Sequence, residues 1–234
     1  MARRLMVRRL GRVEYAEGLR LMESLSAART AGEVPDTLLL LEHPPVVTLG
    51  RGARREHVLA SQEELAARGV GLFATDRGGD VTWHGPGQIV GYPIVDLAPD
   101  RCDVRGWIRD LEETMIRAAA EQGVAAGRLA GRRGVWLGEG AEPATPGPSR
   151  KLGAVGVHLS RWVSSHGFAF NVAPRLSEFD LIVPCGIDGC RVTSLAAELG
   201  RAPERTAVEE SLARALADVL GRELIGELGS GTGS

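Results

Sequence analysis

The sequence predicts an α+β fold: a mixed, largely antiparallel sheet with flanking helices. Strand-like segments outnumber helical ones, they occur in clusters separated by glycine turns, and they do not alternate with helices as parallel sheets require. The 234 residues are 44% hydrophobic and 25% charged, which is ordinary for a globular protein. We expect a single domain over residues 1–225 and a disordered tail over residues 226–234.

Helices are predicted where apolar residues recur every three to four positions. Residues 13–31 form one such segment, and Asp103 is placed to cap another. The apolar stripe of this second helix is expected to comprise Val104, Trp107, Ile108, Leu111 and Met115. Capping boxes at 61–64 and 206–209 predict the starts of a short helix and of the last helix.

Strands are predicted from short apolar runs bounded by glycine or proline, at residues 3–10, 37–41, 46–49, 134–137, 152–159 and 165–172. The run at 37–41 is apolar almost throughout, which is typical of a buried strand. Residues 138–149 are rich in Gly, Pro and Ala, and we expect them to form an exposed, mobile loop.

Charge and composition argue against several classes of protein. The net charge of −2 gives no basic field for nucleic acid or an anionic membrane, and 4% aromatic residues are too few for a base-stacking platform. No apolar run reaches the roughly 18 residues of a membrane span, and the basic N-terminal segment has the pattern of a strand. Three cysteines without a framework spacing indicate reduced thiols and a cytoplasmic location. No pair of histidines has metal-ligand spacing, so we expect no metal.

One basic residue stands apart from the rest. Of 28 basic side chains, 27 are arginine and the remaining one is Lys151. A codon bias towards arginine could leave one lysine by chance. The functional alternative is favoured, because an ammonium group can lose its proton in a protein and a guanidinium cannot.

The segment RGGDVTWHGPGQ at 77–88 is the densest in residues with special backbone properties. Adjacent glycines allow a tight turn and a close approach to a ligand, and His84 could reach into a cleft. The segment could also be a decorated hairpin whose glycines only serve turns. Its spacing matches neither a Walker loop nor a dinucleotide fingerprint.

Small residues recur in two of the predicted strands. Gly153 and Ala154 leave room beside the first strand for a thin substrate, such as an acyl chain or a pantetheine arm. Gly167 and Ala169 leave similar room beside the second. Glycine in a strand can equally allow close packing against another backbone.

Cys185 lies between a proline and a glycine, on a constrained turn whose open approach suits a nucleophile. A free cysteine more often behaves as a small buried apolar residue. A disulfide between Cys185 and Cys190 is a further alternative, which a reducing cytoplasm disfavours.

Together these segments resemble one family, the octanoyl-[acyl carrier protein]–protein octanoyltransferases, also called lipoyl(octanoyl) transferases. The resemblance covers about residues 10–220 and rests on motifs in the same order, LEHPPVVTLGR (41–51), RGGDVTWHGPGQIVGYP (77–93), KLGAVGVHLS (151–160), SHGFAFNV (165–172), PCGI (184–187) and VTSL (192–195). It implies a fold similar to the catalytic module of biotin and lipoate ligases.

The resemblance also implies the site. By motif match, Cys185 and Lys151 would be the catalytic pair. The substrate would contact Arg77, Gly78, Gly79, Asp80, Val81, Thr82, Trp83, His84, Ala154, Val155, Gly156, Gly167, Phe168 and Ala169. Two departures from the family pattern could change the grip on the acyl chain: Val47 replaces a frequent aromatic residue, and Gly153 replaces the usual alanine.

The implied activity is transfer of an octanoyl group from acyl carrier protein to a lysine of a lipoyl domain, through a thioester on Cys185. The phosphopantetheine arm of acyl carrier protein would deliver the acyl group, so no separate cofactor is expected. The acceptors would be lipoyl domains of 2-oxoacid dehydrogenase complexes and the glycine cleavage H protein. Nucleic acid and membranes are not expected as partners.

Two other classes of protein stay compatible with the sequence. An ATP-dependent lipoate or biotin ligase would share the fold but would not need a nucleophilic cysteine. A non-catalytic acyl-binding protein would tolerate the change Cys185→Ser. The combination of Cys185 with Lys151 and the HGPGQ form of the glycine motif favour transfer.

Overall fold

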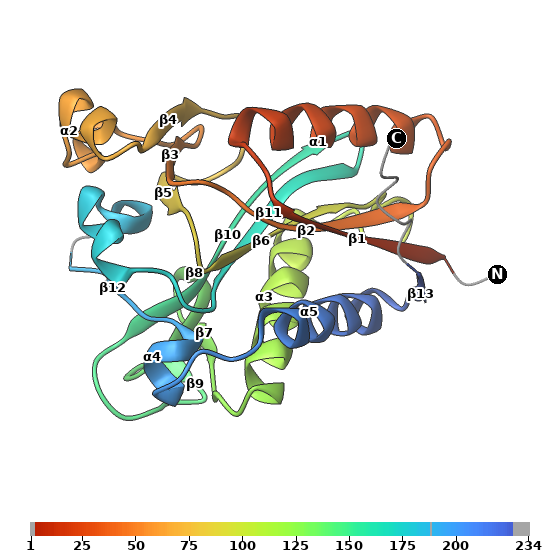
Figure 1. The fold of residues 1–234 in the computed structure, drawn as a ribbon. Helices are drawn as coiled ribbons and strands as arrows, with labels where there is room; N and C mark the ends of the chain where they lie inside the picture. The colour runs from red at the N-terminus through yellow and green to blue at the C-terminus, as the bar shows by residue number, and fades with distance from the viewer. Residues whose placement is uncertain (1–2, 188, 227–234) are drawn as a thin grey trace.

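The computed structural model describes residues 3–187 and 189–226 (Figure 1). The strands of its larger sheet are β1 (Arg4–Arg12), β2 (Asp36–Glu42), β6 (Gln88–Ile94), β7 (Gly127–Leu129), β8 (Arg132–Leu137), β9 (Ala141–Glu142), β10 (Arg150–Ser160), β11 (Val163–Asn171), β12 (Arg191–Val192) and β13 (Glu223–Ile225). Over the described residues, their order is β13-β1-β2-β6-β11-β10-β8-β7-β9, and β12 lies beside β10.

Antiparallel pairing prevails in this sheet. The central ladder β2-β6-β11-β10-β8 is antiparallel throughout, whereas β1 pairs in parallel with β2 and β13, and β12 pairs in parallel with β10. A smaller sheet contains β3 (Val46–Leu49) between β4 (Gly71–Ala74) and β5 (Val81–His84). The predicted α+β fold with a mixed, largely antiparallel sheet is confirmed.

Helices cover both faces of the large sheet, as Figure 1 shows. Helix α1 (Tyr15–Thr30) packs on one face, and α3 (Val104–Glu121) and α5 (Arg205–Leu220) pack on the other. Strand β2 divides its leucines between these layers: Leu38 and Leu40 join the α3–α5 side, and Leu39 and Leu41 join the α1 side. The run at 37–41 is therefore apolar because both of its faces are buried.

Two expectations about helix ends need correction. Asp103 does cap α3, accepting a hydrogen bond from Arg105 N–H at 2.9 Å, but Val104 is 44% exposed and does not belong to the buried stripe. Helix α5 begins at Arg205 without a side-chain cap. The carboxylate of Glu209 is held instead by Arg205 Nε at 2.8 Å, so it does not close a capping box with Thr206.

Of the other predicted capping box, the structure shows the N-cap by Ser61 at the start of α2 (Gln62–Ala67). Ser61 Oγ accepts a hydrogen bond from Glu64 N–H at 3.1 Å. A further short helix, α4 (Leu195–Leu199), begins in the same way at Ser194 and ends at Gly200 in the left-handed conformation.

The loop predicted over residues 138–149 is only partly exposed. Strand β9 lies within it and pairs with β7, and Ala141 is buried. The pairing is close because Gly127 has no Cβ, which would collide with the backbone carbonyl of Glu142. The predicted tail lies outside the described residues from position 227 onward. In the part of the chain that the structure describes, no helix is long and apolar enough to cross a membrane.

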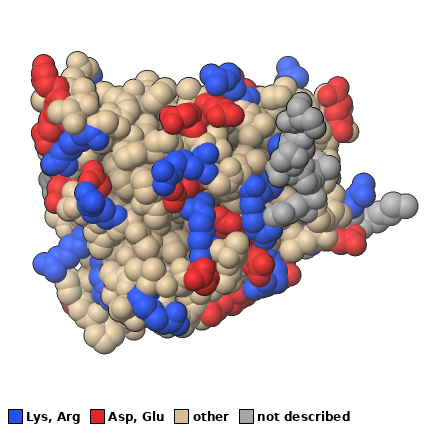
Figure 2. All heavy atoms as spheres, in the orientation of Figure 1, with Lys and Arg blue, Asp and Glu red and all other residues tan. Residues whose placement is uncertain are grey.

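Acidic and basic side chains are mixed over the face shown in Figure 2. Many of the arginines on the molecule pair with nearby carboxylates, as in the bond of 2.6 Å between Arg150 Nη2 and Glu198 Oε2. This distribution is consistent with the net charge of −2.

The turn between β5 and β6 needs a glycine for two reasons, its backbone conformation and its close packing. Gly87 has a φ of +85°, and a Cβ there would collide with the backbone carbonyl of Ala173. Gly32 has a similar φ of +76° but open space around it. We expect Gly32→Ala to lower the free energy of unfolding by about 1 kcal/mol and Gly87→Ala by about 2 kcal/mol more, because only the second adds a steric clash. Urea unfolding of the two variants measures the difference, and equal losses would contradict the reported packing.

Candidate active site

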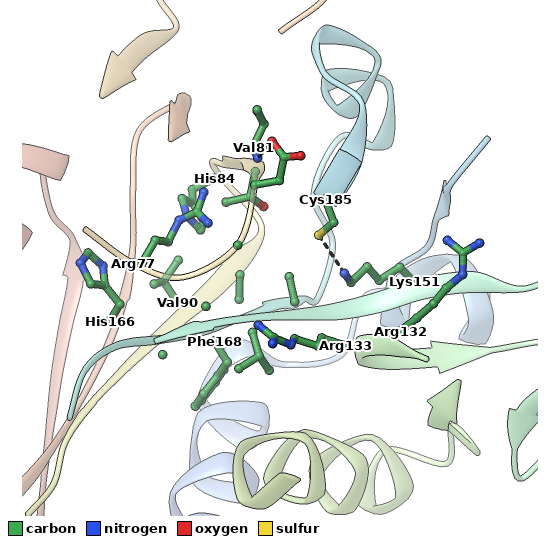
Figure 3. A pocket seen from close by; sticks show the side chains of 18 of the residues that line it. Arg77, Val81, His84, Val90, Arg132, Arg133, Lys151, His166, Phe168 and Cys185 are labelled. Atoms are coloured by element: carbon green, nitrogen blue, oxygen red, sulfur yellow. Dashed lines mark hydrogen bonds between the residues drawn. The ribbon is translucent and has the colours of Figure 1, made fainter. Parts of the chain in front are cut away.

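Two segments that are 34 positions apart meet at one end of β10. Lys151 is the second residue of β10, and Cys185 lies in the short 3-10 turn η3 (Pro184–Gly186). After η3 the chain returns to β10, because β12 pairs with its first two residues and Thr193 N–H donates to the Lys151 carbonyl at 2.9 Å. Lys151 Nζ consequently donates a hydrogen bond to Cys185 Sγ at 2.9 Å (Figure 3).

The surroundings of Lys151 confine its side chain. The residue is only 5% exposed, and its ammonium lies 5.0 Å from the ring centre of Trp136, within the range of a cation–π contact. Gly134 has a φ of +100°, and a Cβ there would lie 2.8 Å from Lys151 Cε. A glycine at this position thus leaves the room that the lysine stem occupies.

The backbone of Cys185 is in the left-handed region, with φ 56° and ψ 21°. This conformation is unfavourable for a residue with a Cβ and persists where the surroundings impose it. Here Gly186 N–H donates to Val183 O at 3.0 Å, and Val183 N–H donates to His57 O at 2.8 Å. The turn is therefore anchored to the 3-10 turn η1 (Arg55–His57).

A carboxylate lies directly beneath this turn. Asp80 Oδ2 occupies the place where a Cβ on Gly186 would project, and it is 2.6 Å from His57 Nδ1. Asp80 Oδ1 accepts hydrogen bonds from the N–H groups of Arg54 and Val81. The side chain of His57 is only 15% exposed. Asp80 and His57 together support the cysteine turn.

A cavity of about 510 Å³ opens beside the Lys151–Cys185 pair. All of the predicted substrate-contact residues line it except Gly78 and Trp83. The Trp83 side chain points to the other face of β5, where it is fully buried against Phe179. Gly78 instead joins its loop to β10 by donating its N–H to Val157 O at 2.8 Å.

Neither departure from the family pattern reaches the cavity. Val47 is buried in the cluster beneath the small sheet that also contains Trp83. A Cβ on Gly153 would point away from the cavity, to within 2.6 Å of Met115 Sδ in α3. The space beside Gly153 is therefore not open to substrate, and an effect of these two positions on the grip on the acyl chain stays a prediction. The thioether of Met115 takes up that room.

Arg77 forms part of the cavity wall and fixes the loop that carries the glycine motif. It is 7% exposed, and its Nη2 donates to Thr48 O at 2.8 Å and to Thr48 Oγ1 at 2.9 Å. Its Nη1 donates to Gly78 O at 3.2 Å. These bonds join the loop to β3, so the cation has a structural role as well as a place in the wall.

Uncharged rings lie at the end of the cavity that is remote from Cys185, where Tyr15, His84 and Tyr92 line the wall and His43 contacts Tyr92. Burial lowers the pKa of His84 to about 3 and that of His43 to about 4, and it raises the pKa of Tyr15 to about 12. His84 Nδ1 is 2.7 Å from Gln88 Oε1, and His43 Nε2 is 2.8 Å from the hydroxyl of Tyr92. These rings are therefore neutral at physiological pH, and His84 is held in place through Gln88.

Several residues of the wall were not predicted from the sequence: Tyr15, Val90, Tyr92, Ala130, Gly131, Arg132, Arg133, His166 and Ile187. The pair Arg132–Arg133 is flanked by Gly131 and Gly134, and this clustering of glycine and arginine could have marked the segment. Tyr15 carries no such signal, because its place in an amphipathic helix gives no indication of which neighbour it touches.

The other cysteines differ from Cys185 in their surroundings. Cys102 is exposed, and burial raises the pKa of the Cys190 thiol. All three thiols are free. Among residues 3–187 and 189–226, no group of three or more His, Cys, Asp or Glu side chains is arranged to hold a metal ion.

Solved structures with this architecture include ligases of lipoate and biotin. A lipoate-protein ligase A bound with ATP superposes with a TM-score of 0.73 at 15% identity, over 97% of this chain and 89% of that chain. A biotin protein ligase of Aquifex aeolicus in complex with biotin and ATP gives a TM-score of 0.53 at 14% identity, over 93% and 70%. The class of fold is therefore that of the lipoate and biotin ligase catalytic module, as predicted.

Sequence similarity narrows this class. The model of the lipoyl protein ligase A/B catalytic domain matches residues 14–217. An octanoyltransferase of Myxococcus xanthus is 52% identical over 94% of this chain, which spans 60% of that protein's length. An octanoyltransferase of Acidobacterium capsulatum is 49% identical over 92% of this chain and 90% of its own. The chain belongs to the octanoyltransferase family.

The neutral buried histidines predict how stability depends on pH. Because the pKa of His84 is lower in the folded chain than the 6.5 of an unfolded one, protons bind preferentially to the unfolded state between about pH 6.5 and 3. Stability is therefore complete above this window and falls as the pH decreases through it. We expect the loss between pH 7 and pH 5 to be about 2 kcal/mol smaller in His84→Gln, since glutamine does not titrate. Urea unfolding at both pH values measures this, and parallel losses in the two proteins would refute it.

Proposed function

We propose that this chain transfers an octanoyl group from the thioester of acyl carrier protein to the ε-amine of a lysine on a lipoyl domain. Residues 1–225 would act as a single acyltransferase domain. The acceptors would be the lipoyl domains of 2-oxoacid dehydrogenase complexes and the glycine cleavage H protein. The observation that carries the proposal is the hydrogen bond of 2.9 Å between Lys151 Nζ and Cys185 Sγ, at the mouth of a cavity with an apolar floor.

In the first step, the Cys185 thiolate attacks the carbonyl carbon of the donor thioester. The neighbouring ammonium of Lys151 favours the thiolate, which is the reactive form of cysteine. Backbone N–H groups of the glycine motif would stabilise the tetrahedral oxyanion. The intermediate collapses when the bond to the pantetheine sulfur breaks, and Lys151 gives its proton to that departing thiolate. The products are an octanoyl thioester on Cys185 and the free thiol of the carrier.

In the second step, the amine of the acceptor lysine attacks the thioester on Cys185. Lys151 is now neutral and can accept the proton that the attacking amine must lose. The carbon–sulfur bond breaks, an amide forms on the acceptor, and the Cys185–Lys151 pair returns to its starting state. One amine thus acts first as an acid and then as a base, which a guanidinium could not do.

The substrate chain would lie between the two sheets. Small residues of β10 and β11 form the floor, and the segment from Arg77 to His84 lies opposite. Proposed contacts are Arg77, Gly79, Asp80, Val81, Thr82, His84, Ala154, Val155, Gly156, Gly167, Phe168 and Ala169. His84 would orient the chain and not act as a base, because burial keeps its pKa near 3 and its Nδ1 is bonded to Gln88.

An ATP-dependent ligase is the alternative closest in fold. The placement of Lys151 against Cys185 favours transfer. In a ligase the acceptor amine attacks an adenylate directly, so the reaction has no step that needs a cysteine. Incubation with octanoyl-acyl carrier protein and a lipoyl domain in the absence of nucleotide separates the two. Octanoylation of the lipoyl domain under these conditions requires a transferase.

A covalent adduct tests the nucleophile. After mixing with octanoyl-acyl carrier protein alone, we expect intact-mass and peptide mass spectrometry to find one octanoyl group on Cys185. Cys185→Ser should abolish the thioester, whereas Cys190→Ser should leave it unchanged, because the Cys190 thiol is kept protonated by burial. A thioester found on Cys190 or Cys102 would overturn the assignment.

The two half-reactions test Lys151. In Lys151→Arg the cation is kept but the base is lost, so we expect transfer from the acylated enzyme to a lipoyl domain to fall by about 10²–10⁴-fold. Rapid-quench measurement starting from the isolated acyl-enzyme isolates this step. Formation of the Cys185 adduct by the same variant shows that its site is folded. Near-normal transfer in Lys151→Arg would mean that another group is the base.

A further inference from the structure

A second cavity lies directly behind the far end of the first. It has a volume of about 600 Å³ and is bounded by the inner side of α1 and by the tip of the β10–β11 hairpin. Its wall is apolar at Leu19, Met22 and Val163, and polar at Glu23, Asp76, His158, Arg161 and several hydroxyl residues including Ser165. Of the residues that line the two cavities, His166 alone lines both.

The position of His166 along the first cavity is plain in Figure 3, where it lies at the end opposite to Cys185 and Lys151. An acyl chain attached to Cys185 and running along β10 and β11 therefore meets His166 after passing the small residues Ala154 and Gly167. Beyond the imidazole, the space continues into the second cavity.

His166 is fixed in this place by two contacts of its ring and one of its backbone. His166 Nε2 is 2.7 Å from Asp76 Oδ1, and its backbone N–H donates to Met22 Sδ at 3.2 Å. The ring of Tyr92 lies perpendicular to it at 6.2 Å between centroids. The backbone of His166 has a φ of +55°, an uncommon conformation for a residue with a side chain. A ring held by so many constraints, and only 4% exposed, acts as a partition.

We propose that the His166 imidazole is the stop that sets the length of the acyl chain, by separating the acyl cavity from the second cavity behind it. The inference rests on the proposed transfer of an acyl group through Cys185. Chains that end before the ring fit the first cavity, and longer chains collide with the ring, which packs against Tyr92. His166 is thus a specificity-determining residue and takes no part in bond making.

Removal of the ring should join the two cavities. Glycine adopts a φ of +55° without strain, so His166→Gly removes the partition and keeps the backbone. The experiment measures the rate of adduct formation on Cys185 with octanoyl-, dodecanoyl- and tetradecanoyl-acyl carrier protein. We expect the ratio of the dodecanoyl to the octanoyl rate to rise about tenfold or more, since the ring no longer blocks the longer chain and its additional methylenes can pack against Leu19, Met22 and Val163.

Three control variants distinguish a steric stop from a general loss of structure. His166→Phe keeps a ring in the wall without the bond to Asp76 and should retain the octanoyl preference. Ser165→Ala changes only the wall of the second cavity and should leave all rates as they are. His166→Asn tolerates the positive φ, shortens the side chain and should give an intermediate ratio, and it replaces His166→Gly if the glycine variant does not fold.

The outcomes separate this inference from the proposed function. If a folded His166→Gly or His166→Asn protein acylates Cys185 with octanoyl but shows the wild-type ratio of chain lengths, the stop is not His166, although the transfer mechanism stands. If the wild-type protein forms no adduct with any donor, the proposed function fails and takes this inference with it.

Discussion

The return of the chain from the cysteine turn to the start of β10 is the constraint on which the site depends. Only two residues of β12 pair with β10, yet this pairing and the hydrogen bond from Thr193 N–H to Lys151 O determine where the preceding turn lies. On its other side the turn is anchored to His57 in η1 and rests on Asp80. Two different sheets therefore hold the cysteine between them, while the large sheet alone holds the lysine. The distance between Cys185 Sγ and Lys151 Nζ therefore depends on how the two sheets are aligned.

The environment of the cavity is divided along its length in a way that suits acyl transfer. Charge is concentrated at one end, where Lys151 and Asp80 lie close to Cys185. The middle is lined by small and aliphatic residues, and the remote end by rings whose burial keeps them neutral. Arg132 and Arg133 also line the wall, and the donors of Arg77 are occupied by carbonyl and hydroxyl oxygens of Thr48 and Gly78. Such a gradient places polar chemistry at the carbonyl of a bound thioester and apolar surface beside its chain.

Much of this arrangement could be predicted from the sequence, because periodicity and motif order are local properties. The buried strand at 37–41, the short strand at 46–49 and the capped helix after Asp103 follow from residue spacing alone. The glycine motif also identified most of one cavity wall. Side chains alternate between the two faces of β5, however, so Trp83 points away from the cavity that Thr82 and His84 line. When the motif is treated as one unit, this alternation is missed.

The remaining errors concern contacts between distant segments. The pairing of Asp80 with His57 depends on how η1 packs against the glycine motif, and the contact of Gly153 with Met115 depends on how α3 crosses β10. Glu209 was assigned to a capping box from its spacing, but Arg205 competes for the same carboxylate. In each of these cases the residue that makes the contact is visible in the sequence, but its partner is determined by tertiary packing.

The scarcity of lysine affects whether the acylated enzyme can acylate its own side chains. A thioester acylates any accessible primary amine that reaches it, so an acylated protein with many surface lysines risks modifying itself or its copies. Here every other cationic side chain is arginine, whose protonated guanidinium is not nucleophilic, and the single ε-amine is buried beside the sulfur. Among its side chains, this surface offers no competing amine, which leaves the activated group to an amine brought by another protein.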